Sequence, residues 1–252
     1  RRLCGYGLIF LLLTFAACSD AFEFSPNQVF DQDSEINLNS KNLARLDTMP
    51  GDDTVTFAFV GDSQRFYDEL DRFIDTVNTI NEIDFILLAG DISDFGLLEE
   101  FELIQDQLAG LNKPYFGVVG NHDLVARGEE IFERMFGPLN FTFVYRSVKF
   151  VAHNTNGKEY PDVAVPDMSW LRSALVANDS ARHLIAVSHV PPFSSDFNED
   201  LTDEYTALFS ETPALLISLH GHVHTHQDGY PYNDGVRYMT SHSFDKKRFV
   251  ML

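Results

Sequence analysis

Short apolar runs alternate with amphipathic stretches from residue 54 to the end of the chain. We predict strands in the apolar runs, at Thr54–Val60, Asp84–Ala89, Pro114–Val119, His183–Val187 and Ala214–Leu219. Between these runs, apolar residues recur at helical spacing, which predicts helices over Phe66–Ile80, Leu97–Leu108 and Asp167–Ala177. Two further runs, Phe141–Tyr145 and Val148–Ala152, predict a β-hairpin. This alternation of strand and helix is typical of an α/β fold.

Each of the five apolar runs is followed by a residue type that can bind a metal ion. In chain order these residues are Asp62, Asp91, Asn121, His189, and the pair His222 and His224. In α/β sheets, binding sites assemble outside the carboxyl ends of the strands. We therefore expect these side chains to converge although they are far apart in the sequence.

The N-terminal residues follow a different pattern, with a basic start, an apolar middle and a finish of small residues. Residues 1–17 are predicted to be an export signal peptide, because the apolar stretch is shorter than the roughly 20 residues of a membrane-spanning helix. The ending Phe15-Ala16-Ala17-Cys18 resembles a bacterial lipobox. We expect an exported bacterial lipoprotein with its lipid on Cys18, anchored to a membrane and facing the periplasm or the cell surface.

Residues 18–53 are polar and acidic, and we predict a lipid-anchored tether followed by an N-terminal arm. Its apolar residues, Phe22, Phe24, Val29 and Phe30, are expected to dock part of the arm on the domain. The domain itself is assigned to residues 54–252. Its last five residues predict a strand with no loop after it, which leaves a C-terminal truncation open, and no methionine precedes Arg1.

Composition excludes several classes of protein. A chain of 252 residues with 44% hydrophobic content has enough apolar surface for one large α/β domain. Its 38 acidic against 18 basic residues, a net charge of −20, argue against nucleic acid as a partner, because phosphate backbones are bound by clustered Lys and Arg. Both cysteines, Cys4 and Cys18, lie in the N-terminal segment, so the domain has no thiolate chemistry. A serine hydrolase is excluded because no Gly-x-Ser-x-Gly motif occurs.

Asp, Asn and His without Cys form a hard-to-borderline set of ligands that suits Mn, Fe or Zn. Two divalent ions exceed the charge of two carboxylates, so such a site is locally cationic within an acidic protein. A pair of ions about 3.5–4 Å apart clamps a phosphoryl group and supplies hydroxide near neutral pH. The sequence therefore indicates a small phosphate ester as the substrate.

The five blocks, in this order, resemble those of the calcineurin-like metallophosphoesterases over residues 55–224. The resemblance implies two packed mixed β-sheets flanked by helices, an αββα sandwich, around a centre of two divalent metal ions. It implies that Asp91 bridges the ions. The first ion would be held by Asp62, His224 and the residue at position 64, and the second by Asn121, His189 and His222.

The same resemblance implies hydrolysis of phosphomonoesters or phosphodiesters through in-line attack by a metal-bound hydroxide. His122 would donate a proton to the leaving oxygen, and Asp94 would hold His122 in place. Arg65 and Arg127 follow the first and third blocks closely and are candidates for contact with the substrate phosphate.

One position departs from the family pattern. Where the first block usually has His, this chain has Gln64, whose amide oxygen is a weaker ligand for a borderline ion. We expect the first ion to bind loosely, to be a harder ion such as Mn, or to rely on three protein ligands and water.

Alternatives stay open. The chief one is a non-catalytic metal- or ligand-binding lipoprotein with a degraded phosphoesterase site, which Gln64 favours and His122 disfavours. A nuclease is a third hypothesis, opposed by the acidic charge. His220 and His226 alternate with the predicted ligands and are expected to lie beside the site or at the surface. The loops at residues 154–161 and 193–199 contain nothing diagnostic of a substrate, and the oligomeric state is undetermined.

Overall fold

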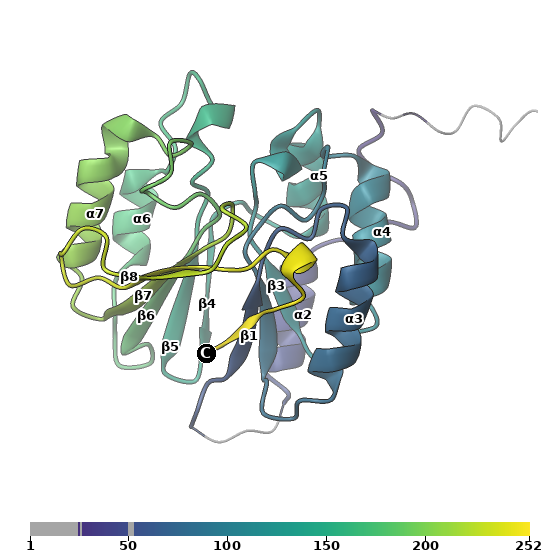
Figure 1. The fold of residues 1–252 in the computed structure, drawn as a ribbon, viewed down its shortest axis with the longest axis horizontal. Coiled ribbons are helices and arrows are strands. Elements are labelled where there is room, and N and C mark those ends of the chain that lie inside the picture. The colour runs from purple at the N-terminus through teal and green to yellow at the C-terminus, as the bar shows by residue number, and fades with distance from the viewer. Residues whose placement is uncertain (1–24, 26, 50–52) are drawn as a thin grey trace, which may run out of the picture.

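The computed structural model of the protein describes residues 25, 27–49 and 53–252. Two β-sheets lie face to face, and helices cover the outer side of each (Figure 1). The predicted α/β sandwich of two mixed sheets flanked by helices is therefore confirmed. The predicted signal peptide, Cys18, Phe22 and Phe24 lie outside the described residues. Within the described ranges, no helix is long and apolar enough to cross a membrane.

The first sheet has the strand order β10-β1-β2-β3. Its strands are β1 (Phe57–Val60), β2 (Phe85–Leu88), β3 (Tyr115–Gly117) and β10 (Val250–Met251). Its helices are α2 (Leu38–Leu46), α3 (Tyr67–Asn78), α4 (Leu98–Leu108) and α5 (Gly128–Met135). Strands β1, β2 and β3 are parallel, and β10 pairs antiparallel with β1. The strand predicted for the last five residues thus forms, at the edge of this sheet.

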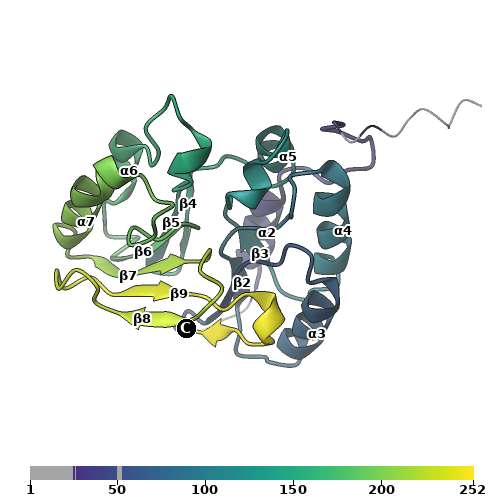
Figure 2. The same cartoon turned by 45° about the horizontal axis from the view of Figure 1, so that its top comes forward.

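The second sheet has the order β4-β5-β6-β7-β9-β8, and its last three strands lie side by side in Figure 2. Its strands are β4 (Phe141–Tyr145), β5 (Val148–Ala152), β6 (His183–Val187), β7 (Leu215–His220), β8 (Gln227–Gly229) and β9 (Tyr238–Thr240). Its helices are α6 (Met168–Ala174) and α7 (Thr202–Ser210). In the described part of the chain, the loops around both sheets also contain the short 3₁₀ helices η2 (His122–Leu124), η3 (Gly157–Glu159), η4 (Glu199–Leu201) and η5 (Phe244–Lys246). Strands β4 and β5 form the predicted hairpin.

Phenylalanine rings fill the space between the two sheets. Phe143 stacks on Phe116 of the other sheet with ring centroids 4.1 Å apart, and on Phe150 at 4.7 Å. Phe85 packs edge-on against both Phe143 and Phe150. Since parallel strands covered on both faces are apolar throughout, the strands could be predicted as continuous apolar runs. This core holds the two sheets against each other.

Helix α2 was not predicted, because its buried face is partly polar. Asn39 bonds both backbone groups of Gly117 in the edge strand β3, at 3.0 and 2.9 Å. Asn42 accepts a hydrogen bond from the backbone N–H of Tyr115 at 3.2 Å. The two amides thereby satisfy backbone groups that an uncovered edge strand would leave unpaired.

Ahead of α2, the predicted docking of the arm is partial. Val29 packs against the outer core of the first sheet. Phe30 is 39% exposed, and the guanidinium of Arg134 lies 3.4 Å above its ring. The arm therefore touches the domain through an apolar contact and a cation–π contact.

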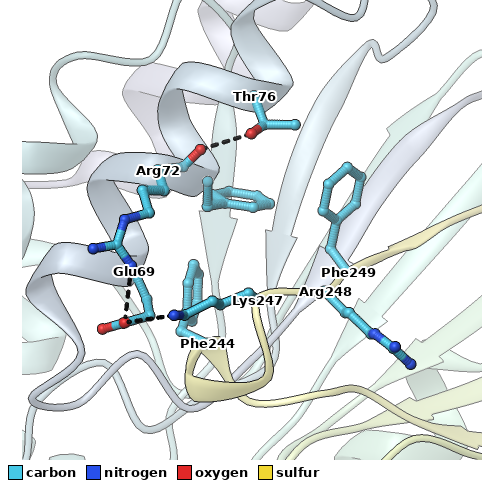
Figure 3. Close-up of a pocket in the computed structure, with 8 residues that line it drawn as sticks. Glu69, Arg72, Thr76, Phe244, Lys247, Arg248 and Phe249 are labelled. Atoms are coloured by element: carbon cyan, nitrogen blue, oxygen red, sulfur yellow. Dashed lines mark hydrogen bonds and ion pairs between the residues drawn. The ribbon is translucent and has the colours of Figure 1, made fainter.

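The segment that leads into β10 packs against α3 (Figure 3). Phe73 of α3 meets Phe244 and Phe249 edge-on, at 5.2 and 5.3 Å between centroids. Beside these rings, Glu69 pairs with Arg72 at 3.2 Å and lies 3.9 Å from Lys247. These contacts fix the C-terminal segment beside β1, the strand that precedes Asp62.

A buried histidine gives the fold a pH dependence. His153 accepts a hydrogen bond from the hydroxyl of Tyr205 at 2.9 Å, and its burial lowers its pKa to about 4. Because an unfolded histidine titrates near 6.5, His153 binds more protons in the unfolded chain than in the folded one between pH 4 and 6.5. The contribution of His153 to stability therefore rises with pH across this window.

We predict that His153→Gln reduces this dependence, because the amide keeps an acceptor for Tyr205 but carries no titrating group. The free energy of unfolding in urea, measured with chelator at pH 5 and pH 6.5, should change less in the variant, by about 1 kcal/mol per pH unit. An identical pH slope in both proteins would contradict the prediction.

Candidate metal centre

The predicted ligands follow the carboxyl ends of strands in both sheets. Asp62 follows β1, Asp91 follows β2, and His189 follows β6. Five of the seven predicted ligands have left-handed backbone, with φ values of 56° (Asp62), 35° (Gln64), 53° (Asp91), 70° (His222) and 55° (His224). Such backbone is costly for residues other than Gly and is concentrated at functional sites. The chain thus turns sharply after β1, β2 and β7, and these turns bring the side chains together.

Glycines let the turns approach one another closely. A Cβ atom on Gly120 would lie 2.1 Å from the backbone nitrogen of Asp91, and one on Gly90, whose φ is +90°, would lie 2.5 Å from the His189 ring. Only a residue without a side chain fits at these two positions. The glycine before Asp91 and the one before Asn121 therefore make room for a neighbouring ligand.

Four predicted ligands form the first of two donor groups, which we call the inner group. It consists of Asp91, Asn121, His189 and His222. His189 Nε2 lies 3.1 Å from both Asp91 Oδ1 and Asn121 Oδ1, and His222 Nδ1 lies 3.1 Å from the same Asn121 oxygen. Two ligands of one ion at about 2.1 Å each are about 3 Å apart at a right angle. The inner group thus has the spacing of a metal site.

The second group, which we call the outer group, consists of Asp62, His224 and Gln64 beside Asp91. His224 Nε2 lies 3.4 Å from Asp62 Oδ1. Gln64 donates its amide N–H to Asp91 Oδ2 at 3.0 Å, so in this arrangement its nitrogen faces the shared carboxylate. The outer group therefore offers fewer free donor atoms than the inner group.

An unpartnered atom supports metal binding here. Asp62 Oδ2 is buried and has no hydrogen-bond partner among the described residues. Asp62 is fully buried and Asp91 is 1% exposed, and buried carboxylates are paired or bind metals. Ligand atoms of Asp62, Asp91 and His189 lie within 4.8 Å of one another. The donor set thus fits divalent cations.

The pKa shifts of Asp91 and His189 also favour a cation at this centre. Burial would raise the pKa of Asp91, but the charge of His189 lowers it to about 2. Burial would lower the pKa of His189, but Asp91 raises it to about 9. The protonated imidazole thus supplies, in the ion-free chain, the positive charge that a cation would supply.

His122 lies at the rim of the centre. Its backbone N–H donates to Asp91 Oδ1 at 3.0 Å, and its ring Nδ1 lies 2.8 Å from the backbone carbonyl of Asp94. The Asp94 carboxylate is farther from that nitrogen, at 3.6 Å, and instead accepts from Arg65 at 3.1 Å. His122 is therefore held mainly by the Asp94 backbone, while the side chain of Asp94 holds Arg65.

Arg127 takes a different position from Arg65. It pairs with Glu130 at the start of α5 and contacts the backbone of Asn27 in the arm. The described contacts do not bring it to the donor groups, and its predicted role in substrate binding stays a prediction.

His220 is outside both donor groups. It is fully buried and bonds Ser188 and Ser218.

Asp123 is a structural residue that we did not predict. It is fully buried and accepts from the backbone of Ser93 at 2.7 Å and of Gly120 at 2.8 Å, which ties the loops after β2 and β3 together. Burial, together with the charge of Asp91, raises its pKa to about 7. Its position directly after His122, within the third block, is the sequence feature that could have identified Asp123.

The chain is similar to known phosphoesterases in sequence and in fold. The family model of the calcineurin-like phosphoesterases matches residues 55–226. The chain belongs to this family. A 3',5'-cyclic-nucleotide phosphodiesterase of Nostoc sp. is 28% identical over 153 residues, covering 57% of this phosphoesterase-family chain and 56% of that protein. A probable cyclic nucleotide phosphodiesterase of Rhodopseudomonas palustris is 26% identical over 155 residues, covering 54% and 55%.

This member of the family thus spans about half the length of the curated relatives it matches. A dimetal phosphatase from Danio rerio has a similar fold, with a TM-score of 0.61 and 12% identity over 79% of this chain and 92% of that one. The expected family is therefore shown, and the fold agrees with it.

The two donor groups differ in a way that can be tested at Gln64. We predict that Gln64→His raises the metal content of the outer group, because an imidazole nitrogen replaces an amide that bonds Asp91. After dialysis against micromolar Mn²⁺ or Zn²⁺, elemental analysis should rise from near one ion per chain towards two. Gln28→His, in the N-terminal arm, is the control. An unchanged content in Gln64→His would show that Gln64 does not limit the outer group.

Proposed function

We propose that the protein is a metal-dependent phosphodiesterase for small substrates of the 3',5'-cyclic nucleotide class. The observation that carries the proposal is the meeting of the predicted ligands from both sheets, with His122 beside Asp91 and Arg65 paired with Asp94 next to His122. The matched relatives support the substrate class, because they are named as phosphodiesterases of cyclic nucleotides.

The position of each residue suggests its role in binding metal ions or in transferring a proton. The inner group and the outer group would each hold one divalent ion, with Asp91 shared between them. Such ions neutralise phosphate charge and activate water near neutral pH. The protein's own contribution is to fix the donors, to keep the carboxylates away from bulk water, and to place a proton donor at the rim.

His122 is suited to general acid catalysis. Its Nδ1–H donates to the Asp94 carbonyl, so the imidazolium form would give its Nε2 proton to the leaving oxygen and keep the hydrogen bond to Asp94. Its side chain is 36% exposed, which makes it accessible to a substrate. Arg65 is 62% exposed, and its guanidinium is directed by Asp94. We assign Arg65 to contact with the substrate phosphate.

The chief alternative is a binding lipoprotein that does not turn over substrate. Gln64 favours it, because its amide occupies one oxygen of the shared carboxylate. Hydrolysis remains our proposal, because His122 is held beside Asp91 and its ring is accessible. We also propose, from residues 1–18, that the chain is exported and anchored through a lipid on Cys18.

We predict Mn²⁺-dependent hydrolysis of bis(p-nitrophenyl) phosphate and of 3',5'-cyclic AMP by the residue 19–252 protein. His122→Ala should lower kcat by at least about 100-fold, as expected for loss of a general acid. His183→Ala, at the exposed start of β6, is the matched control and should retain activity. A folded, Mn-loaded protein without turnover on diesters and monoesters would contradict catalysis and favour the binding lipoprotein.

A further inference from the structure

His222 has partners on both nitrogens of its ring. Nδ1 faces Asn121 Oδ1 of the inner group at 3.1 Å. On the opposite side, Nε2 lies 2.8 Å from Asp196 Oδ2. The side chain of His222 is only 16% exposed, so the ring is enclosed between the inner group and this carboxylate.

The oxygens on both sides of the ring accept hydrogen bonds, but a neutral imidazole has only one N–H to donate. Asp196 Oδ2 is the nearer acceptor, at 2.8 Å against 3.1 Å for Asn121 Oδ1, and belongs to a carboxylate, which binds an N–H more strongly than an amide oxygen does. The N–H is therefore placed on Nε2, which leaves the lone pair of Nδ1 facing the inner group, where a cation would have both Nδ1 and Asn121 Oδ1 as donors. In the other tautomer, the N–H would point at the inner group and block coordination.

Asp196 is itself fixed by its loop. It lies seven residues after His189, so one loop carries both an inner-group residue and the partner of another. The backbone N–H of Asp196 donates to Ser194 Oγ at 3.2 Å, and the next residue, Phe197, is buried in the core under α7. Asp196 thus sits on an anchored turn.

Lys158 engages the remaining oxygen of the same carboxylate. Its Nζ lies 2.6 Å from Asp196 Oδ1, and it belongs to η3, in the loop that follows β5. The two loops touch, because a Cβ atom on Gly157 would lie 2.9 Å from Cβ of Asn198. Lys158 therefore leaves Oδ2 to face His222.

We infer that Asp196 is a positioning residue that holds His222 in the Nε2–H tautomer for metal binding, with Lys158 orienting Asp196. The inference rests on the proposed function in one respect, that His222 is a metal ligand. It links the metal centre to two loops, residues 154–161 and 193–199, whose sequences contain nothing diagnostic of a substrate.

The test compares three variants in Mn²⁺ binding. Asp196→Ala should weaken the binding of the tighter ion by about 10–100-fold, the usual cost of losing such a partner. Asp196→Asn keeps an oxygen that accepts from Nε2–H and should recover most of this loss. Lys158→Met should have a smaller effect than Asp196→Ala. Calorimetric titration at pH 8 measures the affinities, and Asp228→Ala, which breaks an exposed pair with Arg237, is the matched control.

A second measurement determines the tautomer of His222 in the ion-free protein. In ion-free protein labelled with ¹⁵N-histidine, long-range proton–nitrogen spectra should show His222 as the Nε2–H form in the wild type and Asp196→Asn, and as a mixture in Asp196→Ala. Unchanged affinity and tautomer in a folded Asp196→Ala protein would overturn this inference while leaving the proposed hydrolysis intact. A wild type that binds no ion would overturn both proposals.

Discussion

Two buried carboxylates, Asp62 and Asp91, set the constraint on which the rest of the centre depends. Removing such charges from water costs several kcal/mol each unless opposite charge or hydrogen bonds compensate. The chain meets this need with His189 beside Asp91, His224 beside Asp62, and backbone N–H groups from the neighbouring loops. One oxygen of Asp62 is still without a partner among the described residues. A divalent cation would complete the compensation.

The same constraint explains how an acidic protein can accept an anionic substrate. The net charge is −20, yet surface charges are screened over about 8–10 Å at physiological salt. At the centre, two ions would outweigh the two carboxylates, and Arg65 stands at the rim. The charge that matters to a phosphodiester is therefore local, and the overall acidity opposes only extended polyanions.

The position of the centre could be predicted because two signals coincide. Apolar runs mark the strands of both sheets, and a ligand type follows each run at the edge where parallel strands end. Helix α2 could not be predicted in this way, since Asn39 and Asn42 face inward to bond the edge of β3, and a polar inward face breaks the hydrophobic pattern. Asp196 was missed because only tertiary packing brings its loop to His222.

Sequence neighbours of a motif also behave differently once folded. Arg65 and Arg127 each follow a block in the sequence, but Arg65 pairs with Asp94, which also lies beside His122, whereas Arg127 pairs with Glu130 of α5. Gln64 keeps its place in the first block, although its nitrogen faces Asp91. The inner and outer groups are therefore unequal, a difference that arises from one amide.

An anomalous difference map from crystals of the protein grown with Mn²⁺ tests the metal centre most directly. We predict two peaks on either side of the Asp91 carboxylate. The stronger peak should contact Asn121, His189 and His222, and the weaker one Asp62 and His224. A folded, Mn²⁺-saturated crystal with no peak at these residues would contradict this prediction.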